Sequence, residues 1–99
     1  MQLNKLNKKE MEQLFTAILN LKNMEECYQL FEDLCTVGEV KSIAQRLEVA
    51  RMLEEGCTYS QIESETGAST ATISRVKRCL HYGTNGYKLA LKRLKEENV

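Results

Sequence analysis

The chain has 99 residues, of which 42% are apolar and 28% charged, and its 14 basic and 14 acidic side chains give a formal net charge of zero. This composition is typical of a single globular domain and excludes a disordered chain. No apolar run approaches the ~18 residues that span a bilayer, and the N-terminus lacks the apolar core of a secretory signal, so we expect one domain, residues 1–99, in the cytoplasm. A chain this short buries only about 65% of its unfolded surface, so a lone core would be thin and oligomerisation would compensate.

Signals for helices recur along the whole chain, which contains no proline and no strand-like alternation. A side-chain cap followed three residues later by Glu or Gln satisfies the free N–H groups of a first helical turn. This pattern occurs at Asn7/Glu10, Asn23/Glu26, Thr36/Glu39 and Thr58/Gln61, and Ser69 is a further cap without such a partner. Three glycines, Gly56, Gly67 and Gly83, follow helical runs, where we expect a left-handed residue to end each helix.

Apolar residues recur at helical spacing between these caps and glycines. Two stripes come first, and their members are Met11, Leu14, Phe15, Ile18 and Leu19, then Met24, Cys27, Tyr28, Phe31, Leu34 and Cys35. A longer helix over residues 36–55 is apolar on more than one side, which predicts a central position. Helices over about 59–65, 70–82 and 85–97 follow. The sequence therefore predicts an all-α fold of six helices.

Cysteine and histidine give no sign of a metal site or of catalysis. Cys27, Cys35, Cys57 and Cys79 form no Cys-x-x-Cys pair, so we expect reduced, mostly buried thiols. His81 has no ligand partner at the right spacing, and it does not face Cys79, two residues away on one helix. We therefore predict that the protein is not an enzyme and binds no metal.

The zero net charge conceals two regions of opposite charge. Residues 1–65 hold 7 basic and 12 acidic side chains, whereas residues 66–99 hold 7 basic and 2 acidic ones. No acid lies between Glu65 and Glu96. Because phosphate responds to the local field, the last third of the chain is the candidate nucleic-acid-binding region.

Residues 58–82 have the pattern of a helix-turn-helix. Gly67 supplies the turn, and Ile62, Ala68 and Ile73 supply the apolar residues that lock the two helices together. Glu63 stands where small apolar residues are common, and we expect it to be exposed. A helical hairpin with a solvated basic face is the alternative reading of the same pattern.

The second helix of this motif should present its N-terminal part to base edges, because Ile73 and Leu80 turn inward. Short hydroxyl and methyl groups allow a close approach to the major groove. The predicted base-reading residues are Thr70, Ala71, Thr72 and Ser74, and the predicted phosphate contacts are Gln61, Ser69, Lys77 and Arg78.

The run from Leu34 to Leu80 resembles the Trp repressor superfamily, most closely its branch of YerC/YecD-type Trp repressor-related proteins. The resemblance is carried by "QRLEVARMLEEG", by the following Ser-Gln and by "GASTATISR". It implies six helices in an intertwined homodimer, with dimerisation helices over about 7–55 and 85–97. It also implies a sequence-specific transcription regulator, expected to be a repressor, whose two helix-turn-helix units bind double-stranded DNA at a palindromic operator.

The resemblance further implies an effector pocket. The best-known member binds tryptophan as corepressor between two arginines, and Arg46 and Arg75 stand at the matching positions. Val76 replaces a glycine beneath the indole, and Cys79 replaces a serine that helps to bind the amino group. We therefore expect no tryptophan corepressor, and either a ligand-free DNA-binding state or another small-molecule effector.

A protein-interaction module without sequence-specific DNA binding is the alternative function. In that interpretation the acidic part docks a partner, or the last helix lies on an acidic protein or membrane surface. Its cations Lys88, Lys92, Arg93 and Lys95 lie opposite Tyr87, Leu91 and Leu94. A dimer core helix with a solvated face explains the same pattern, so we expect no membrane partner.

Overall fold

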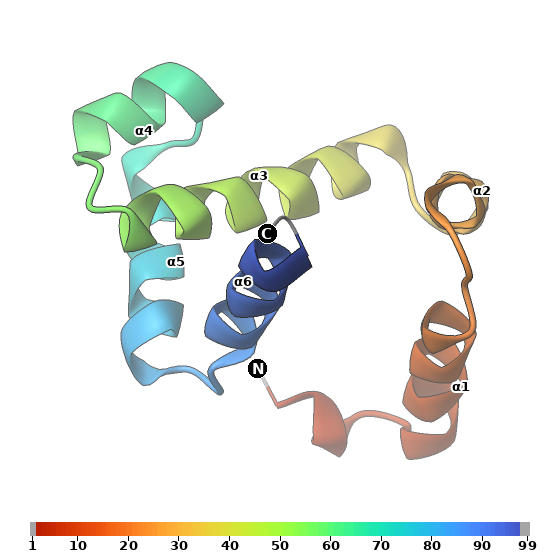
Figure 1. Ribbon diagram of the computed structural model, residues 1–99. Coiled ribbons are helices and arrows are strands. Elements are labelled where there is room, and N and C mark those ends of the chain that lie inside the picture. The colour runs from red at the N-terminus through yellow and green to blue at the C-terminus, as the bar shows by residue number, and fades with distance from the viewer. Residues whose placement is uncertain (1, 98–99) are drawn as a thin grey trace. The chain divides into compact units, whose positions relative to one another are not determined.

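The computed structural model describes residues 2–97, and every regular element among them is helical. A short 3-10 helix, η1 (Leu3–Lys5), precedes six α-helices: α1 (Lys8–Leu19), α2 (Met24–Leu34), α3 (Val37–Glu54), α4 (Tyr59–Thr66), α5 (Thr70–Tyr82) and α6 (Gly86–Glu97) (Figure 1). The predicted all-α fold of six helices is therefore confirmed. No helix in this range is both long and apolar enough to cross a membrane.

Side-chain caps begin four of the helices where the sequence predicted them. The capping residue and the N–H that it binds are Asn7 and Glu10 for α1, Asn23 and Glu26 for α2, Thr58 and Gln61 for α4, and Ser69 and Thr72 for α5. Each bond satisfies an N–H group that has no partner within its own helix. The limits of these helices are therefore set by local chemistry.

The three glycines do not all behave as predicted. Gly56 and Gly67 have φ of 82° and 73°, as expected for left-handed residues that end a helix. Gly83 is extended, with φ −85° and ψ −157°, so its left-handed assignment was wrong. Its N–H donates to the Cys79 carbonyl oxygen at 2.9 Å, and a Cβ built on Gly83 would lie 2.5 Å from that oxygen. The positive φ in this link, 68°, belongs to Asn85.

Backbone contacts divide the chain into two compact units, Met1–Val37 and Gly38–Val99. We refer to them as the N-terminal unit and the core unit. Among residues 2–97, the buried residues all lie in the core unit: Val49, Ala50, Met52, Ile62, Ala68, Ile73, Val76, Leu80 and Leu91. They come from α3 to α6 and the turn before α5, so a single apolar cluster holds the helix-turn-helix against α3 and α6.

The N-terminal unit buries none of the residues of α1 or α2. Its two predicted stripes are present but largely open to solvent, with Leu19 82% and Met24 73% exposed. The four cysteines are free, but Cys79 is exposed and the other three are only half-buried, so the prediction of mostly buried thiols was wrong. The physical reason is that Cys27 and Cys35 lie in an apolar stripe that is only partly covered in a single chain. Cys79 lies on α5 but is not a member of the buried cluster.

Candidate nucleic-acid interface

The junction of α4 and α5 is fixed by a compact set of hydrogen bonds. Thr66 donates from its hydroxyl to the Ile62 carbonyl oxygen at 2.7 Å and accepts from the Ala68 N–H at 3.1 Å. The Gln45 side-chain amide on α3 donates to the Thr66 carbonyl oxygen at 3.1 Å. Together with the positive φ of Gly67, these bonds hold the turn between two helices that share buried Ile62 and Ile73. The local geometry is that of a helix-turn-helix.

The two faces of α5 differ sharply in character. Ile73, Val76 and Leu80 are buried in the core cluster, at the spacing of one helical stripe. On the remaining surface, Thr70, Ala71 and Ser74 are exposed and Thr72 is half-buried. The structure therefore brings all four predicted base-reading residues to the surface at the start of one helix.

The hydroxyl groups at the start of α5 are already hydrogen-bonded in the free protein. Ser69 Oγ lies 3.1 Å from Thr72 Oγ1 and accepts from the Thr72 N–H at 3.1 Å. Thr70 donates from its hydroxyl to Glu63 Oε1, which lies on α4. This arrangement fixes the threonine rotamers before any ligand arrives.

Glu63 is a residue whose contribution sequence reasoning missed. It was correctly predicted to be exposed, but its bond to Thr70 was not foreseen because the two residues lie seven apart across a turn. Its carboxylate places a negative charge beside the candidate base-reading surface. Carboxylates in such a position can accept from cytosine, and they also repel phosphate.

Gln61 has part of its side chain committed to the cap of α4. Its Oε1 accepts from the Thr58 N–H at 2.8 Å, while its own N–H donates to Thr58 Oγ1 at 3.2 Å. The side-chain NH₂ group makes none of the hydrogen bonds that the structure gives for residues 2–97. Gln61 can therefore cap α4 and donate to a phosphate oxygen at the same time.

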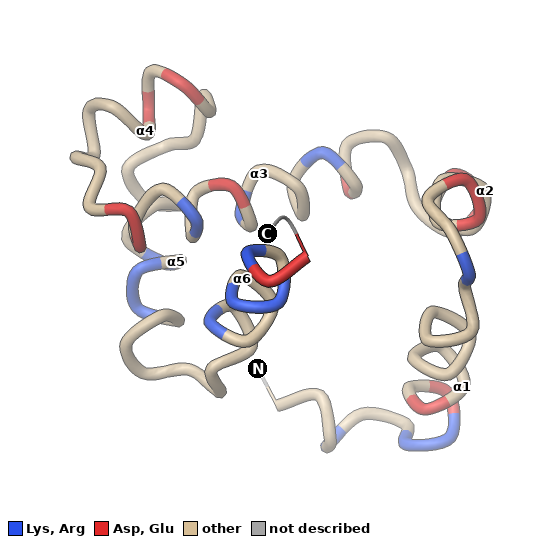
Figure 2. The backbone as a smooth tube through the Cα atoms, viewed as in Figure 1, with Lys and Arg blue, Asp and Glu red and all other residues tan. Residues whose placement is uncertain are grey.

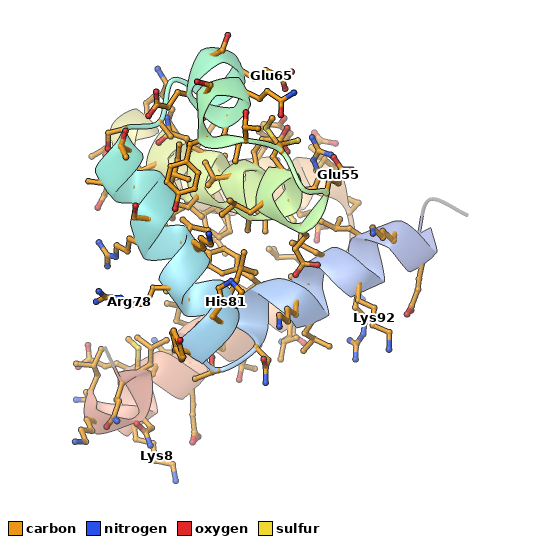
Figure 3. The ribbon with its side chains drawn as sticks, turned by 90° about the vertical axis from the view of Figure 1, so that its left-hand side faces the viewer. Lys8, Glu55, Glu65, Arg78, His81 and Lys92 are labelled. Carbon is orange, nitrogen blue, oxygen red and sulfur yellow. The ribbon has the colours of Figure 1, made fainter. Side chains whose placement is uncertain are left out.

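In the core unit, the charged residues of α5, and those of α6 up to Lys95, are all Lys or Arg, whereas those of α4 are acidic and Glu54 ends α3 (Figure 2). Lys77 and Arg78 are exposed on α5 and form no ion pair among the described residues. Arg78 projects from α5 on the side away from α6 (Figure 3). The Lys77 ammonium lies 5.7 Å from the centroid of the Tyr59 ring, within the range of a cation–π contact.

Ion pairing in the core unit is concentrated on α3 instead. Arg51 Nε lies 2.7 Å from Glu48 Oε1, and Arg51 Nη1 lies 2.8 Å from Glu55 Oε2. The hydrogen bond from Arg51 lowers the pKa of Glu48, and the same bond raises the pKa of Arg51. Because Arg51 is already paired, it adds little free positive charge to the surface.

The four residues of the predicted effector pocket are not equivalent. Val76 is 1% exposed and belongs to the core cluster, whereas Arg46 is half-buried and Arg75 and Cys79 are exposed. The Val76 side chain therefore fills space within the core unit. Among residues 2–97, no group of three or more His, Cys, Asp or Glu side chains is placed to hold a metal ion.

Comparison with known proteins gives consistent matches over almost the whole chain. The sequence profile of the Trp repressor protein family matches residues 9–95. The uncharacterised protein YerC of Bacillus subtilis (strain 168) is 67% identical over 96 residues, which cover 97% of this chain and 92% of YerC.

Two solved structures have the same fold. One is the crystal structure of a candidate Trp repressor from Staphylococcus aureus, with a TM-score of 0.92, 56% identity, and coverage of 96% of this chain and 95% of that one. The other is a TrpR-like protein from Eubacterium eligens, with a TM-score of 0.89, 55% identity, and coverage of 93% and 95%. The resemblance noted in the sequence is therefore confirmed.

Proposed function

Because the chain belongs to the Trp repressor family, we propose that it is a sequence-specific DNA-binding transcription regulator that acts as a homodimer on a palindromic operator. The observation that carries this proposal is the start of α5. Small hydroxyl and methyl side chains stand exposed there, on a helix whose opposite face is locked into the core. A surface of this kind fits the major groove closely.

The proposed roles divide the site between bases and phosphates. Thr70, Ala71, Thr72 and Ser74 read base edges, and Gln61, Ser69, Lys77 and Arg78 contact the phosphate backbone. Three of the four base-reading residues are exposed and Thr72 is half-buried. The Gln61 side-chain NH₂ group makes none of the hydrogen bonds that the structure gives, and Lys77 and Arg78 form no ion pair among residues 2–97. No catalytic role is proposed for any of these residues.

The exposed apolar residues of the N-terminal unit support the homodimer. Leu3, Leu6, Phe15, Leu19, Met24, Tyr28, Leu34 and Val37 are all large apolar residues left open to solvent by a single chain. An apolar surface of this extent indicates contact with a further polypeptide. A second copy would place a second α5 on DNA, which accounts for the palindromic operator.

Tryptophan is not proposed as a corepressor. Val76 occupies buried space where the resemblance requires a glycine, and branched bulk there opposes the binding of a flat ring. Isothermal titration of the protein with tryptophan should therefore give no saturable heat. Micromolar, saturable binding would overturn this part of the proposal.

The function is tested by selection of genomic DNA fragments with the purified protein at ~0.15 M salt, followed by affinity measurements on the enriched site. We expect a palindromic site to be enriched without added ligand. Recovery of a site only with one added amino acid would identify an effector and contradict the ligand-free state. If no site is enriched, the result would favour the alternative function, a protein-interaction module without sequence-specific DNA binding.

Two substitutions separate the proposed phosphate and base contacts. Lys77→Ala should weaken binding to all sequences and reduce the salt slope by about one unit. Thr72→Ala should cost roughly 1–3 kcal/mol at the operator and change the preferred sequence. Equal losses from Thr72→Ala on operator and random DNA would contradict its base-reading role.

A further inference from the structure

A pocket of about 490 Å³ lies in the core unit and is not lined by any proposed base-reading residue. It is bounded by the end of α3, the α3–α4 link, the start of α4, the last turns of α5 and the start of α6. Its volume is within the range of about 300–1,000 Å³ typical of small-molecule sites. None of Arg46, Arg75, Val76 and Cys79 lines it, so it is distinct from the position of the family's corepressor.

The charged lining of the pocket is mainly cationic. Lys77 and His81 lie four residues apart and therefore on one face of α5, and Lys88 comes from the first turn of α6. Glu54 is the acidic residue of the lining, and Leu53 and Leu80 add apolar surface. Neither lysine has an ion-pair partner among residues 2–97, so neither positive charge is paired with a carboxylate there.

The position of Lys77 is the most informative feature of this lining. Its ammonium lies over the ring of Tyr59, which also lines the pocket and packs against the core cluster. In the free protein this contact holds Lys77 at the rim of the pocket. The same side chain is proposed above to contact DNA phosphate. A ligand in the pocket and the DNA backbone would therefore compete for the positive charge of Lys77.

We propose that this pocket binds a small phosphate ester, and that a bound ester weakens DNA binding by engaging Lys77. A phosphate group offers three acceptor oxygens with strong negative charge, which suit two ammonium groups and an imidazole N–H. Glu54 can accept from the hydroxyl groups of the ester, and the leucines contact its carbon skeleton. The effect on DNA rests on the proposed function, whereas binding of the ester does not.

Binding of the ester is tested on the free 99-residue chain by NMR titration with glucose 6-phosphate at constant ionic strength. We expect saturable shifts centred on Lys77, His81 and Lys88, with none from glucose alone or from added KCl. Lys88→Gln should weaken the ester at least about tenfold, since one of three donors is lost. The matched control is Lys92→Gln, which removes the same charge one turn further along α6 at an exposed residue outside the lining.

The outcomes of this titration decide the ligand. Figure 3 shows Lys92 projecting from α6 away from α3, so its substitution should leave the ester affinity within about twofold. Equal weakening by Lys88→Gln and Lys92→Gln would indicate a general charge effect and overturn the site. Succinate binding as tightly as glucose 6-phosphate would overturn the assignment to phosphate.

The coupling to DNA is tested with the enriched operator and the same probe. Saturating glucose 6-phosphate should raise the Kd for DNA about fivefold in the wild-type protein, the effect of one phosphate contact at ~0.15 M salt. At the same concentration of ester the effect should be smaller for Lys88→Gln, which binds the ester at least about tenfold more weakly but retains every proposed DNA contact. An unchanged Kd with a saturated pocket would refute the coupling alone. If the protein binds no DNA even without the ester, the proposed function is refuted, while the result of the NMR titration with the ester still stands.

Discussion

The N-terminal unit and the core unit contain helices with the same kinds of caps, yet all the buried residues among residues 2–97 lie in the core unit. In the N-terminal unit, Asn7 and Asn23 cap α1 and α2 as effectively as Thr58 and Ser69 cap α4 and α5. The difference lies in what covers the apolar stripes. In the core unit part of each helix is buried in one apolar cluster, whereas no residue of α1 or α2 is buried.

This difference shows that the features that begin and orient a helix are not the features that stabilise it. Caps and apolar period determine where a helix begins and which face is apolar, but stability comes mainly from covering that face. The core unit therefore carries its own stabilisation. The N-terminal unit exposes large apolar residues, and we propose that a second copy of the chain covers them.

The largest expected effect is a loss of core packing. Ile62→Ala should lower the free energy of unfolding by about 2–5 kcal/mol, because the side chain is 0% exposed and its removal leaves a cavity. Urea unfolding at low and high protein concentration should give the same loss. Ser64→Ala on the exposed side of α4 is the control, and an equal loss there would contradict the assignment of the core.

A charge introduced into the exposed apolar stripe of α1 should instead weaken the association of two chains. Leu19→Asp should raise the dissociation constant of the dimer at least tenfold, or about 1.4 kcal/mol, because the carboxylate would lose water on association. Sedimentation velocity measures the change. Gln13→Asp introduces the same charge on α1 outside the stripe and should leave the dimer intact. An unaltered dimer in Leu19→Asp would show that this stripe is not the interface.

Removal of a helix cap should lower the free energy of unfolding by a similar amount in both units. Thr58→Ala and Asn23→Ala should each cost about 1 kcal/mol, because each removes one exposed hydrogen bond to an N–H group that then lacks a protein partner. Thermal unfolding of both variants provides the measurement. A cost confined to Thr58→Ala would mean that caps stabilise a helix only where a core is present.

Removal of an ion pair should give the smallest change in the free energy of unfolding. Arg51 lowers the pKa of Glu48, so the pair stabilises the fold at pH above the ordinary Glu value of 4.5, and the contribution is lost as pH falls through the lowered pKa. Because both side chains are more than a third exposed, Arg51→Gln should cost less than about 1 kcal/mol at neutral pH. The difference from wild type should shrink in acid.

A pair in the N-terminal unit serves as the counterpart to Arg51. Lys8 and Glu12 lie 3.8 Å apart with side chains 85% and 64% exposed, so Lys8→Gln should leave the unfolding free energy unchanged at any pH. A measurable cost for Lys8→Gln would show that exposure does not separate the two pairs.

Much of the fold could be predicted because its signals are local. The caps and the apolar period gave the helix limits, and the inward positions of Ile73 and Leu80 gave the outward face of α5. Burial could not be predicted in the same way. Apolar spacing in α1 resembles that in α5, and only three-dimensional packing decides which stripe a single chain covers.

Two features of the sites depend on contacts that sequence spacing does not contain. The bond between Thr70 and Glu63 crosses a turn, so no helical repeat relates the two residues. The pocket collects its lining from α3, α4, α5, α6 and the α3–α4 link, and its cations become neighbours only after folding. Charge counting marked the last third of the chain, but it could not distinguish a DNA surface from a ligand pocket.

The link between α5 and α6 constrains two nearby residues in different ways, one through side-chain volume and the other through its backbone φ angle. Gly83 leaves no volume for a side chain beside the Cys79 carbonyl oxygen, whereas Asn85 requires only a positive φ, which glycine adopts as readily. A randomised library across this link should therefore retain one amino acid at position 83 and accept at least two at position 85. The least tolerant position of the molecule would then lie in an exposed loop, outside the buried cluster.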